Sequence, residues 1–308
     1  MLTKSGLRLG LALPQTFLDR KVDSALVRDV AIRAETLGYD DLWLTEGIVA
    51  SHTTLEPLTT LAFVGAVTSR IRLGVSVIIL NQRNPLQLAK ALASLDQLSG
   101  GRIIAGLGLG DGTRLYPAFG IGEERRVARF NEALRVMKAL WTQPSVTLDG
   151  DFWQLQDISI EPKPLQQPLP VWFGAHSPAA MRRAARQADG WMCAGSTRLE
   201  DVVPLLNQMR SSLAEVGREE AGFALSKRIY MVVDVDENRA RRRLADWFSF
   251  QYGSAERAPV FGLAGSPQRC VEVLQGWRDA GYQHILLNIC DDQQAQLELL
   301  TEKVVPEL

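Results

Sequence analysis

The chain has 308 residues, of which 46% are hydrophobic and 22% charged, and its formal net charge is -1. This composition is typical of a globular protein with a large core. The near-zero net charge gives no electrostatic reason to expect a nucleic-acid partner or an anionic membrane surface. No long uncharged apolar run is present, and residues 1–10 lack the apolar stretch of a secretory signal, so we expect a cytoplasmic protein.

Cysteine and histidine are sparse. The cysteines are Cys193, Cys270 and Cys290, an odd number without CxxC spacing, and the three histidines form neither an HxH nor an HExxH pattern. We therefore expect neither a disulfide framework nor a metal site.

Strand-like apolar runs alternate with amphipathic helical segments from end to end. The expected strands cover residues 7–13, 40–45, 71–79, 102–110, 170–175, 190–195, 228–235 and 284–289. Helices are expected over 23–37, from Pro57, over 85–99, over 125–141, from Ser177, over 199–216 and over 266–280. Residues 142–170 are proline-rich, and DGDFW within them suggests a small hairpin.

This alternation predicts a fold of the α/β class. Near-continuous apolar strands indicate a parallel sheet covered by helices, and eight such units in about 300 residues favour a closed (β/α)8 TIM barrel, with short insertions in the loops at its C-terminal face. No GxGxxG follows the first strand, which disfavours a dinucleotide-binding fold.

In such a barrel, functional residues lie in the loops after the strands. Glu46 ends the second strand, and a structural, paired carboxylate is as good an explanation as a site carboxylate. Gly110 and Asp111 lie in a glycine-rich loop that is more often a tight turn than a ligand cradle. Ser177 caps a helix whose free amides favour an anion, although most helix starts bind nothing. His52 is expected to be an ordinary loop residue and His284 a structural one.

Four aromatic residues crowd the segment 247–252, namely Trp247, Phe248, Phe250 and Tyr252. They fit either the core side of a helix or a lid over an apolar pocket.

The order and spacing of longer segments carry a family resemblance. AETLGYDDLWLTE (34–46), RNPLQLAKALASLDQLSGGRIIAGLGLG (83–110) and PKPLQQPLPVWFGAHSPAAMRRAARQADGW (162–191) are its main markers. Together with the remaining segments they resemble the bacterial luciferase-like flavin monooxygenase superfamily, and within it the branch that depends on the deazaflavin coenzyme F420. The resemblance covers essentially the whole chain and implies one domain over residues 1–308 and a homodimer through the second and third helices.

The resemblance implies a cofactor ring in the barrel mouth, backed by a bulge with a non-prolyl cis peptide that matches Ser76-Val77. Gly110 and Asp111 are expected to line the ring, with Glu46 beside it. The phosphate is expected at the loops that match Gly174, Ala175, His176 and Ser177, and Gly195, Ser196 and Arg198. Glu46 and Asp111 are the expected catalytic residues, and no metal is expected.

One position departs from the family pattern. Many members have a catalytic His after the acidic residue that matches Glu46, and this chain has Gly47. Chemistry that relies on that His, such as sugar-phosphate oxidation, is therefore doubtful, and any proton transfer falls to Glu46, Asp111, His52 or water.

The leading hypothesis is hydride transfer between F420 and a small organic substrate whose identity the sequence does not reveal. An FMN-dependent monooxygenase using reduced flavin and oxygen, or a non-catalytic flavin-binding protein, is the alternative.

Overall fold

The computed structural model describes residues 3–17, 21–110 and 114–308. Within these ranges eight parallel strands close into a barrel, because β7 pairs both with β5 and with β10. In chain order the barrel strands are β1 (Arg8–Ala12), β3 (Asp41–Leu44), β5 (Arg72–Val75), β7 (Ile103–Gly108), β10 (Val171–Gly174), β11 (Gly190–Cys193), β12 (Ala224–Val233) and β14 (His284–Ile289). The predicted barrel is confirmed.

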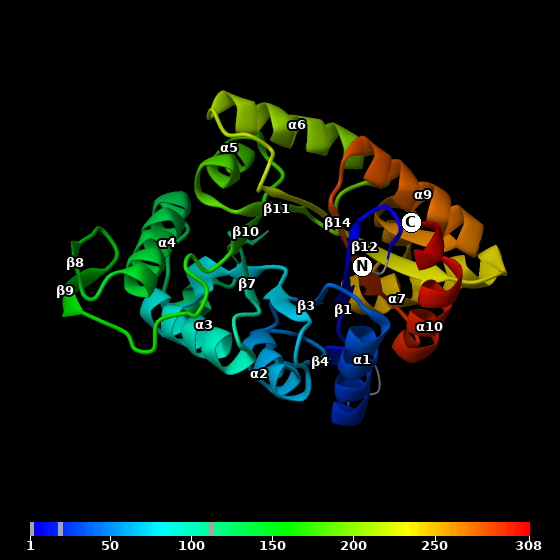
Figure 1. Cartoon of the computed structure of the whole chain (residues 1–308), viewed down its shortest axis with the longest axis horizontal. Helices are drawn as coiled ribbons and strands as arrows, with labels where there is room; N and C mark the ends of the chain where they lie inside the picture. Colours follow the sequence, from blue (N-terminus) through cyan, green and yellow to red (C-terminus); the bar gives the residue numbers. More distant parts are fainter. Residues whose placement is uncertain (1–2, 18–20, 111–113) are drawn as a thin grey trace.

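Helices surround the barrel, as Figure 1 shows. The seven helices placed from apolar spacing and caps are all present: for α1, Asp23 accepts the Leu26 N–H and Gly38 ends the helix with φ of 93°. The helices are α1 (Ser24–Leu37), α2 (Pro57–Val67), α3 (Pro85–Ser99), α4 (Arg126–Thr142), α5 (Pro178–Gln187), α6 (Val202–Glu215), α7 (Glu237–Tyr252), α8 (Ala258–Phe261), α9 (Pro267–Ala280) and α10 (Gln293–Lys303). The bounds of α7, and the helices α8 and α10, were not predicted.

Short strands decorate the barrel. The expected hairpin is formed by β8 (Val146–Asp149) and β9 (Gln154–Ile158) and projects beside α4 (Figure 1). β2 (Thr16–Phe17) pairs with β4 (Thr53–Thr54), β6 (Ile78–Ile79) continues β5 after a break, and β13 (Gly262–Gly265) adds to the C-terminal half of β12. The strand β13 was not predicted, and β12 begins four residues earlier than predicted.

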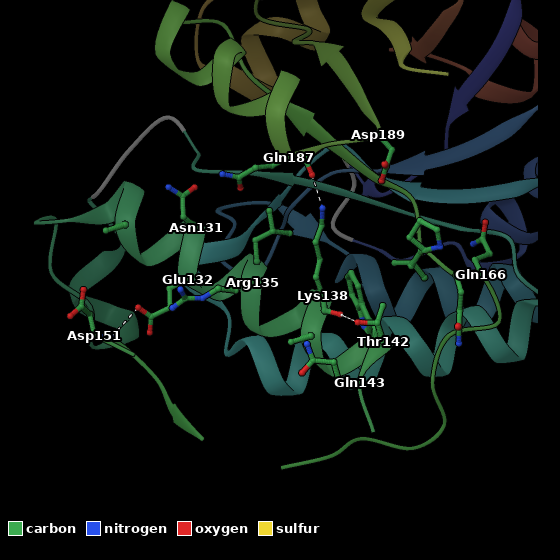
Figure 2. A pocket seen from close by; sticks show the side chains of 17 residues that line it. Asn131, Glu132, Arg135, Lys138, Thr142, Gln143, Asp151, Gln166, Gln187 and Asp189 are labelled. Atoms are coloured by element: carbon green, nitrogen blue, oxygen red, sulfur yellow. Dashed lines mark hydrogen bonds between the residues drawn. The ribbon is translucent and has the colours of Figure 1, made fainter. Parts of the chain in front are cut away.

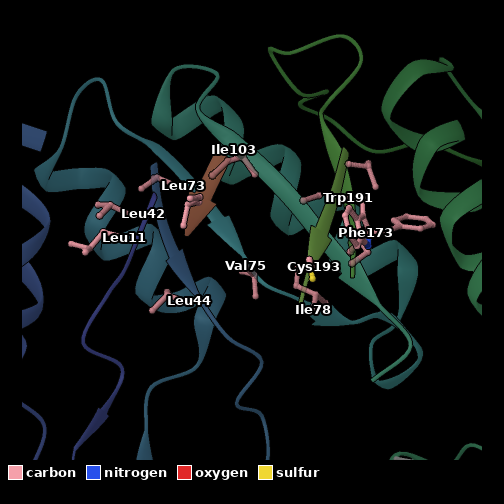
Figure 3. Close-up of a cluster of buried hydrophobic side chains, with 14 of the residues drawn as sticks. Leu11, Leu42, Leu44, Leu73, Val75, Ile78, Ile103, Phe173, Trp191 and Cys193 are labelled. Carbon is pink, nitrogen blue, oxygen red and sulfur yellow. The ribbon is translucent and has the colours of Figure 1, made fainter. Parts of the chain in front are cut away.

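Most of the hydrophobic core lies between the strands and the helices, where alternate strand residues point outward. Leu42, Leu73 and Trp191 belong to this layer (Figure 3). The barrel interior holds a separate cluster that includes Trp43 and Trp172, whose ring centroids lie 5.3 Å apart. A side chain at Gly74 would collide with the Trp43 ring, since a Cβ there would lie 2.5 Å from Cζ3.

A buried network of hydrogen-bonded polar side chains lies at the N-terminal end of the barrel interior. Asp41 accepts hydrogen bonds from Trp43 Nε1 and Arg72 Nη2 and lies 2.7 Å from His284 Nε2, while His284 Nδ1 lies 2.6 Å from Ser226 Oγ. Burial alone would raise the pKa of Asp41, but the charges and hydrogen bonds of His284 and Arg72 outweigh it and hold this pKa well below its usual range. His284 is a structural residue, as expected.

Candidate active site

A cavity of about 1070 Å³ opens at the C-terminal ends of the barrel strands. Every described residue that the sequence analysis assigned to the cofactor lines it: Glu46, Ser76, Val77, Gly110, Gly174, Ala175, His176, Ser177, Gly195, Ser196 and Arg198. Asp111 lies outside the described residues. The structure therefore brings these residues together, whereas the role of each stays a prediction.

One wall of the cavity is the break between β5 and β6. The peptide bond Ser76-Val77 is cis, as expected from the resemblance. The Val77 side chain lies against two glycine positions, since a Cβ on Gly108 would come 2.6 Å from Val77 Cγ2 and one on Gly174 would come 3.1 Å from Cγ1. These glycines leave the room that the bulged segment occupies.

Glu46 lies at the edge of this wall with its carboxylate fully engaged by the protein. Oε1 accepts from Arg83 Nη2 at 2.8 Å and from the Gly47 amide at 3.0 Å, and Oε2 accepts from Arg83 Nε at 3.2 Å and from the Ile79 amide at 3.1 Å. Its side chain is only 8% exposed. Because Arg83 also binds Glu56, this network fixes the start of α2 and of α3 to the strand break.

Gly47 has no room for the imidazole that many family members carry there. A Cβ at this position would lie 2.9 Å from Thr54 Cγ2 and 3.4 Å from Gln15 Nε2. His52 does not replace it, because its ring packs on Phe250 with centroids 4.2 Å apart and is not among the described residues that line the cavity.

The start of α5 forms the neighbouring part of the lining, since Gly174 at the end of β10 lies against Val77. Ser177 Oγ accepts the Ala180 amide, Pro178 occupies the first turn, and no acidic residue lies in that turn. The free amides and the helix dipole at this end favour an anion.

Two arginines on this side also line the cavity. Arg198 follows β11, the strand next to β10, and its guanidinium is held by Glu200 at 2.7 Å. Arg183 Nε is buried and has no hydrogen-bond partner among the described residues, and burial lowers the pKa of this guanidinium. An unsatisfied buried donor is rare in folded proteins and indicates a missing acceptor.

Sequence reasoning missed Arg228, which lies in the middle of β12 and points into the cavity. It donates to Asn288 Oδ1 from Nη2 at 2.7 Å and to the Ser76 carbonyl from Nη1 at 3.2 Å, and its guanidinium lies over the Tyr230 ring. The available signal was an arginine at the start of the apolar run Ile229 to Val233.

The aromatic residues of α7 divide between both expected roles. Phe248 is buried in a cluster with Tyr230 and Leu244, yet Phe248 and Tyr252 also line the cavity.

The cavity as a whole is cationic: its described lining contains Arg126, Arg183, Arg198, Arg228 and Arg257 but only two carboxylates, Glu46 and Asp201.

A second hollow of about 840 Å³ lies outside the barrel, between α4 and the segments 143–169 and 187–189 (Figure 2). Several of its polar groups are engaged by the protein itself. Glu132 accepts the amides of Asp151, Phe152 and Trp153, which closes the hairpin turn, and Lys138 Nζ donates to the Gln187 carbonyl at 2.6 Å. The barrel-mouth cavity is therefore the better candidate.

Within the described ranges, His, Cys, Asp and Glu side chains form no group that could hold a metal ion. None of the described helices has both the length and the apolar character needed to cross a membrane.

The fold and the cavity define the class: a (β/α)8 barrel whose strand-end loops form a large cationic ligand site. The chain belongs to the luciferase-like monooxygenase family, whose model matches residues 11–284.

Individual relatives support this assignment over nearly the whole chain. The F420-dependent glucose-6-phosphate dehydrogenase of Kineococcus radiotolerans is 28% identical over 91% of this chain and 92% of its own. A solved F420-dependent secondary alcohol dehydrogenase in complex with an F420-acetone adduct has a TM-score of 0.83 at 18% identity, over 97% of this chain and 98% of its own. The coenzyme F420 dependent tetrahydromethanopterin reductase of Methanopyrus kandleri has a TM-score of 0.81, at 18% identity and the same coverages. At this identity the solved structures show a shared fold.

Proposed function

We propose that the protein is an oxidoreductase that transfers hydride between coenzyme F420 and a small organic substrate. The relatives named for F420 support the choice of cofactor. The observation that carries the proposal is the cationic cavity, with an unsatisfied Arg183 Nε beside the start of α5.

F420 has the groups that such a cavity would hold. It combines a tricyclic deazaflavin ring, a ribityl-type chain, a phosphate and an oligoglutamate tail, whereas FMN ends at the phosphate. When bound, the deazaflavin ring supplies the hydride chemistry and reacts poorly with oxygen. The negative charges of such a ligand match the cationic lining, of which Arg183 and Arg198 are the arginines that we assign to the phosphate.

The protein would contribute position and charge. The Ser76-Val77 segment, supported by Arg228 and by the glycines behind Val77, would form the surface for the ring. The amides of residues 175–177, with Ser177, Arg183 and Arg198, would bind the phosphate, and Gly195 and Ser196 would close this end. Glu46 would hold the strand end in place through Arg83 rather than exchange protons, because four protein donors already engage its carboxylate.

Titration of the purified protein with F420, FMN and FAD, followed by fluorescence, tests the proposal. We expect binding of F420 that is tighter than binding of FMN. Tight FMN binding without detectable F420 binding, or oxygen consumption during turnover with reduced FMN, would replace it with an FMN-dependent monooxygenase. Binding without turnover of any substrate would favour a non-catalytic flavin-binding protein.

We also propose a homodimer formed through α2 and α3. α2 exposes apolar side chains, among them Phe63, which is 42% exposed, and on α3 Leu98 is 81% exposed. Light scattering of the wild type and of Phe63→Glu measures this directly: a monomeric wild type would refute the proposal. Cytoplasmic location stays a prediction.

A further inference from the structure

A row of two tyrosines between two arginines forms one wall of the cavity, on the β12 and α7 side. Its members are Arg228, Tyr230, Tyr252 and Arg257, and all four line the cavity. The Arg228 guanidinium lies 4.9 Å from the Tyr230 ring centroid, the Tyr230 and Tyr252 hydroxyls are hydrogen-bonded, and the Arg257 guanidinium lies 5.1 Å from the Tyr252 centroid. We call this the arginine–tyrosine row.

The Arg257 guanidinium contacts two aromatic rings, and its N–H groups have no acceptor among the described residues. Its guanidinium faces Tyr252 and Phe261 at the same time, the latter at 5.4 Å. Cation–π contacts of this kind use the face of the guanidinium and leave its N–H edges available. No carboxylate or carbonyl accepts from the Arg257 side chain among the residues that the structure describes. Arg257 is exposed, so its N–H edges are accessible to an acceptor that comes from outside the protein.

The surroundings of the Arg257 guanidinium are aromatic. Phe248, Tyr252 and Phe261 line the same part of the cavity. Rings of this kind favour a flat, conjugated ligand by offset or edge-to-face packing. Arg228 differs from Arg257, because Asn288 and the Ser76 carbonyl already occupy its donors. Arg257 is thus the group that an incoming anion would meet, and Arg228 marks the end of the row near the Ser76-Val77 wall.

We propose that the arginine–tyrosine row is the substrate end of the site and that it binds a planar, conjugated organic carboxylate, with the carboxylate on Arg257 and the flat part against Tyr252 and Phe261. This inference rests on the proposed function only in calling the ligand a substrate. The cofactor phosphate is assigned to the other wall, at α5, so the two anions occupy separate arginines.

The test uses matched pairs of probes that differ in charge alone: benzoate and benzamide, cinnamate and cinnamamide, 2-naphthoate and 2-naphthamide. Calorimetry measures their binding to the full-length protein, with and without F420. Arg257→Gln is compared with Arg242→Gln, which removes an exposed arginine of α7 that is not part of the described lining. F420 affinity is measured on the same samples.

We expect at least one carboxylate to bind more tightly than its amide, and Arg257→Gln to weaken that carboxylate roughly 10- to 100-fold, the range of one charge-assisted contact. Arg242→Gln and the three amide controls should show no such change, and F420 affinity should be unchanged in both variants.

Three outcomes would overturn the inference: no carboxylate preferred over its amide, equal carboxylate binding in Arg257→Gln, or an equal loss of F420 affinity in Arg257→Gln, which would assign Arg257 to the cofactor. Failure of the proposed function looks different. In that case the carboxylate preference and its dependence on Arg257 persist while F420 does not bind.

Discussion

Replacing Glu46 by Gln tests whether this carboxylate is a structural anchor. The amide retains one oxygen, which can keep the Ile79 N–H and the Arg83 Nε contacts. The new NH2 group then faces two donors, Arg83 Nη2 and the Gly47 amide. One charge-assisted bond is lost, at about 1.5 to 3 kcal/mol, together with one backbone bond, at about 0.5 to 1.5 kcal/mol. We therefore expect a loss of about 2 to 4 kcal/mol in the free energy of unfolding.

Urea unfolding followed by circular dichroism measures this loss. Glu56→Gln is the matched control, since Glu56 binds the same Arg83 atom at the same 2.8 Å but its side chain is 34% exposed. Because Glu56 is partly exposed and its amide variant can still accept the Thr59 N–H at the start of α2, we expect a smaller loss than for Glu46→Gln. If Glu46→Gln unfolds at the same urea concentration as Glu56→Gln, the anchor argument is wrong, and a proton-transfer role for Glu46 becomes the better explanation.

Three further predictions address the two cavity walls and the barrel interior. Gly108→Ala places a Cβ 2.6 Å from Val77 Cγ2. We expect this variant to bind F420 more weakly and to lose about 1 to 3 kcal/mol in the free energy of unfolding. Unchanged F420 affinity in a fluorescence titration would show that Val77 does not support the ring. Arg183→Met should weaken F420 binding roughly 10- to 100-fold, while Arg182→Met, an exposed neighbour 3.8 Å from Glu215, should not; equal effects would remove Arg183 from the phosphate site. The folded-state pKa of Asp41 is held below its usual value. Its ionised form therefore stabilises the protein above about pH 4, and this stability is lost as the pH falls further. A free energy of unfolding that stays constant between about pH 5 and pH 2 would contradict this.

The strands could be predicted because each satisfies a local rule. Residues 41–44 and 103–108 are apolar runs of strand length bounded by turn residues, and such a pattern needs no knowledge of distant contacts. β13 escaped prediction because its four residues, Gly262 to Gly265, are stabilised by pairing with β12 rather than by their own pattern.

The site was predictable only in part. Ser177 carries its own signal as a helix cap, whereas the ring-side break at Ser76-Val77 came from the family resemblance. Arg257 and Tyr252 could not be paired from the sequence, because their contact depends on how α7 turns into α8. Glu46 remained ambiguous for the same reason: its partner Arg83 lies 37 residues away.

The chain Asp41–His284–Ser226 at the other end of the barrel has the residue types and the hydrogen-bond order of a serine hydrolase triad. All three side chains are completely buried, so no ester or amide can approach the serine oxygen. Hydrogen-bond distances alone therefore do not identify a catalytic triad, and access of substrate to the serine decides the matter. At the N-terminal end of the barrel the charged side chains stabilise the closed sheet. The loops at the C-terminal end can therefore vary in sequence, and the substrate with them, without loss of the fold.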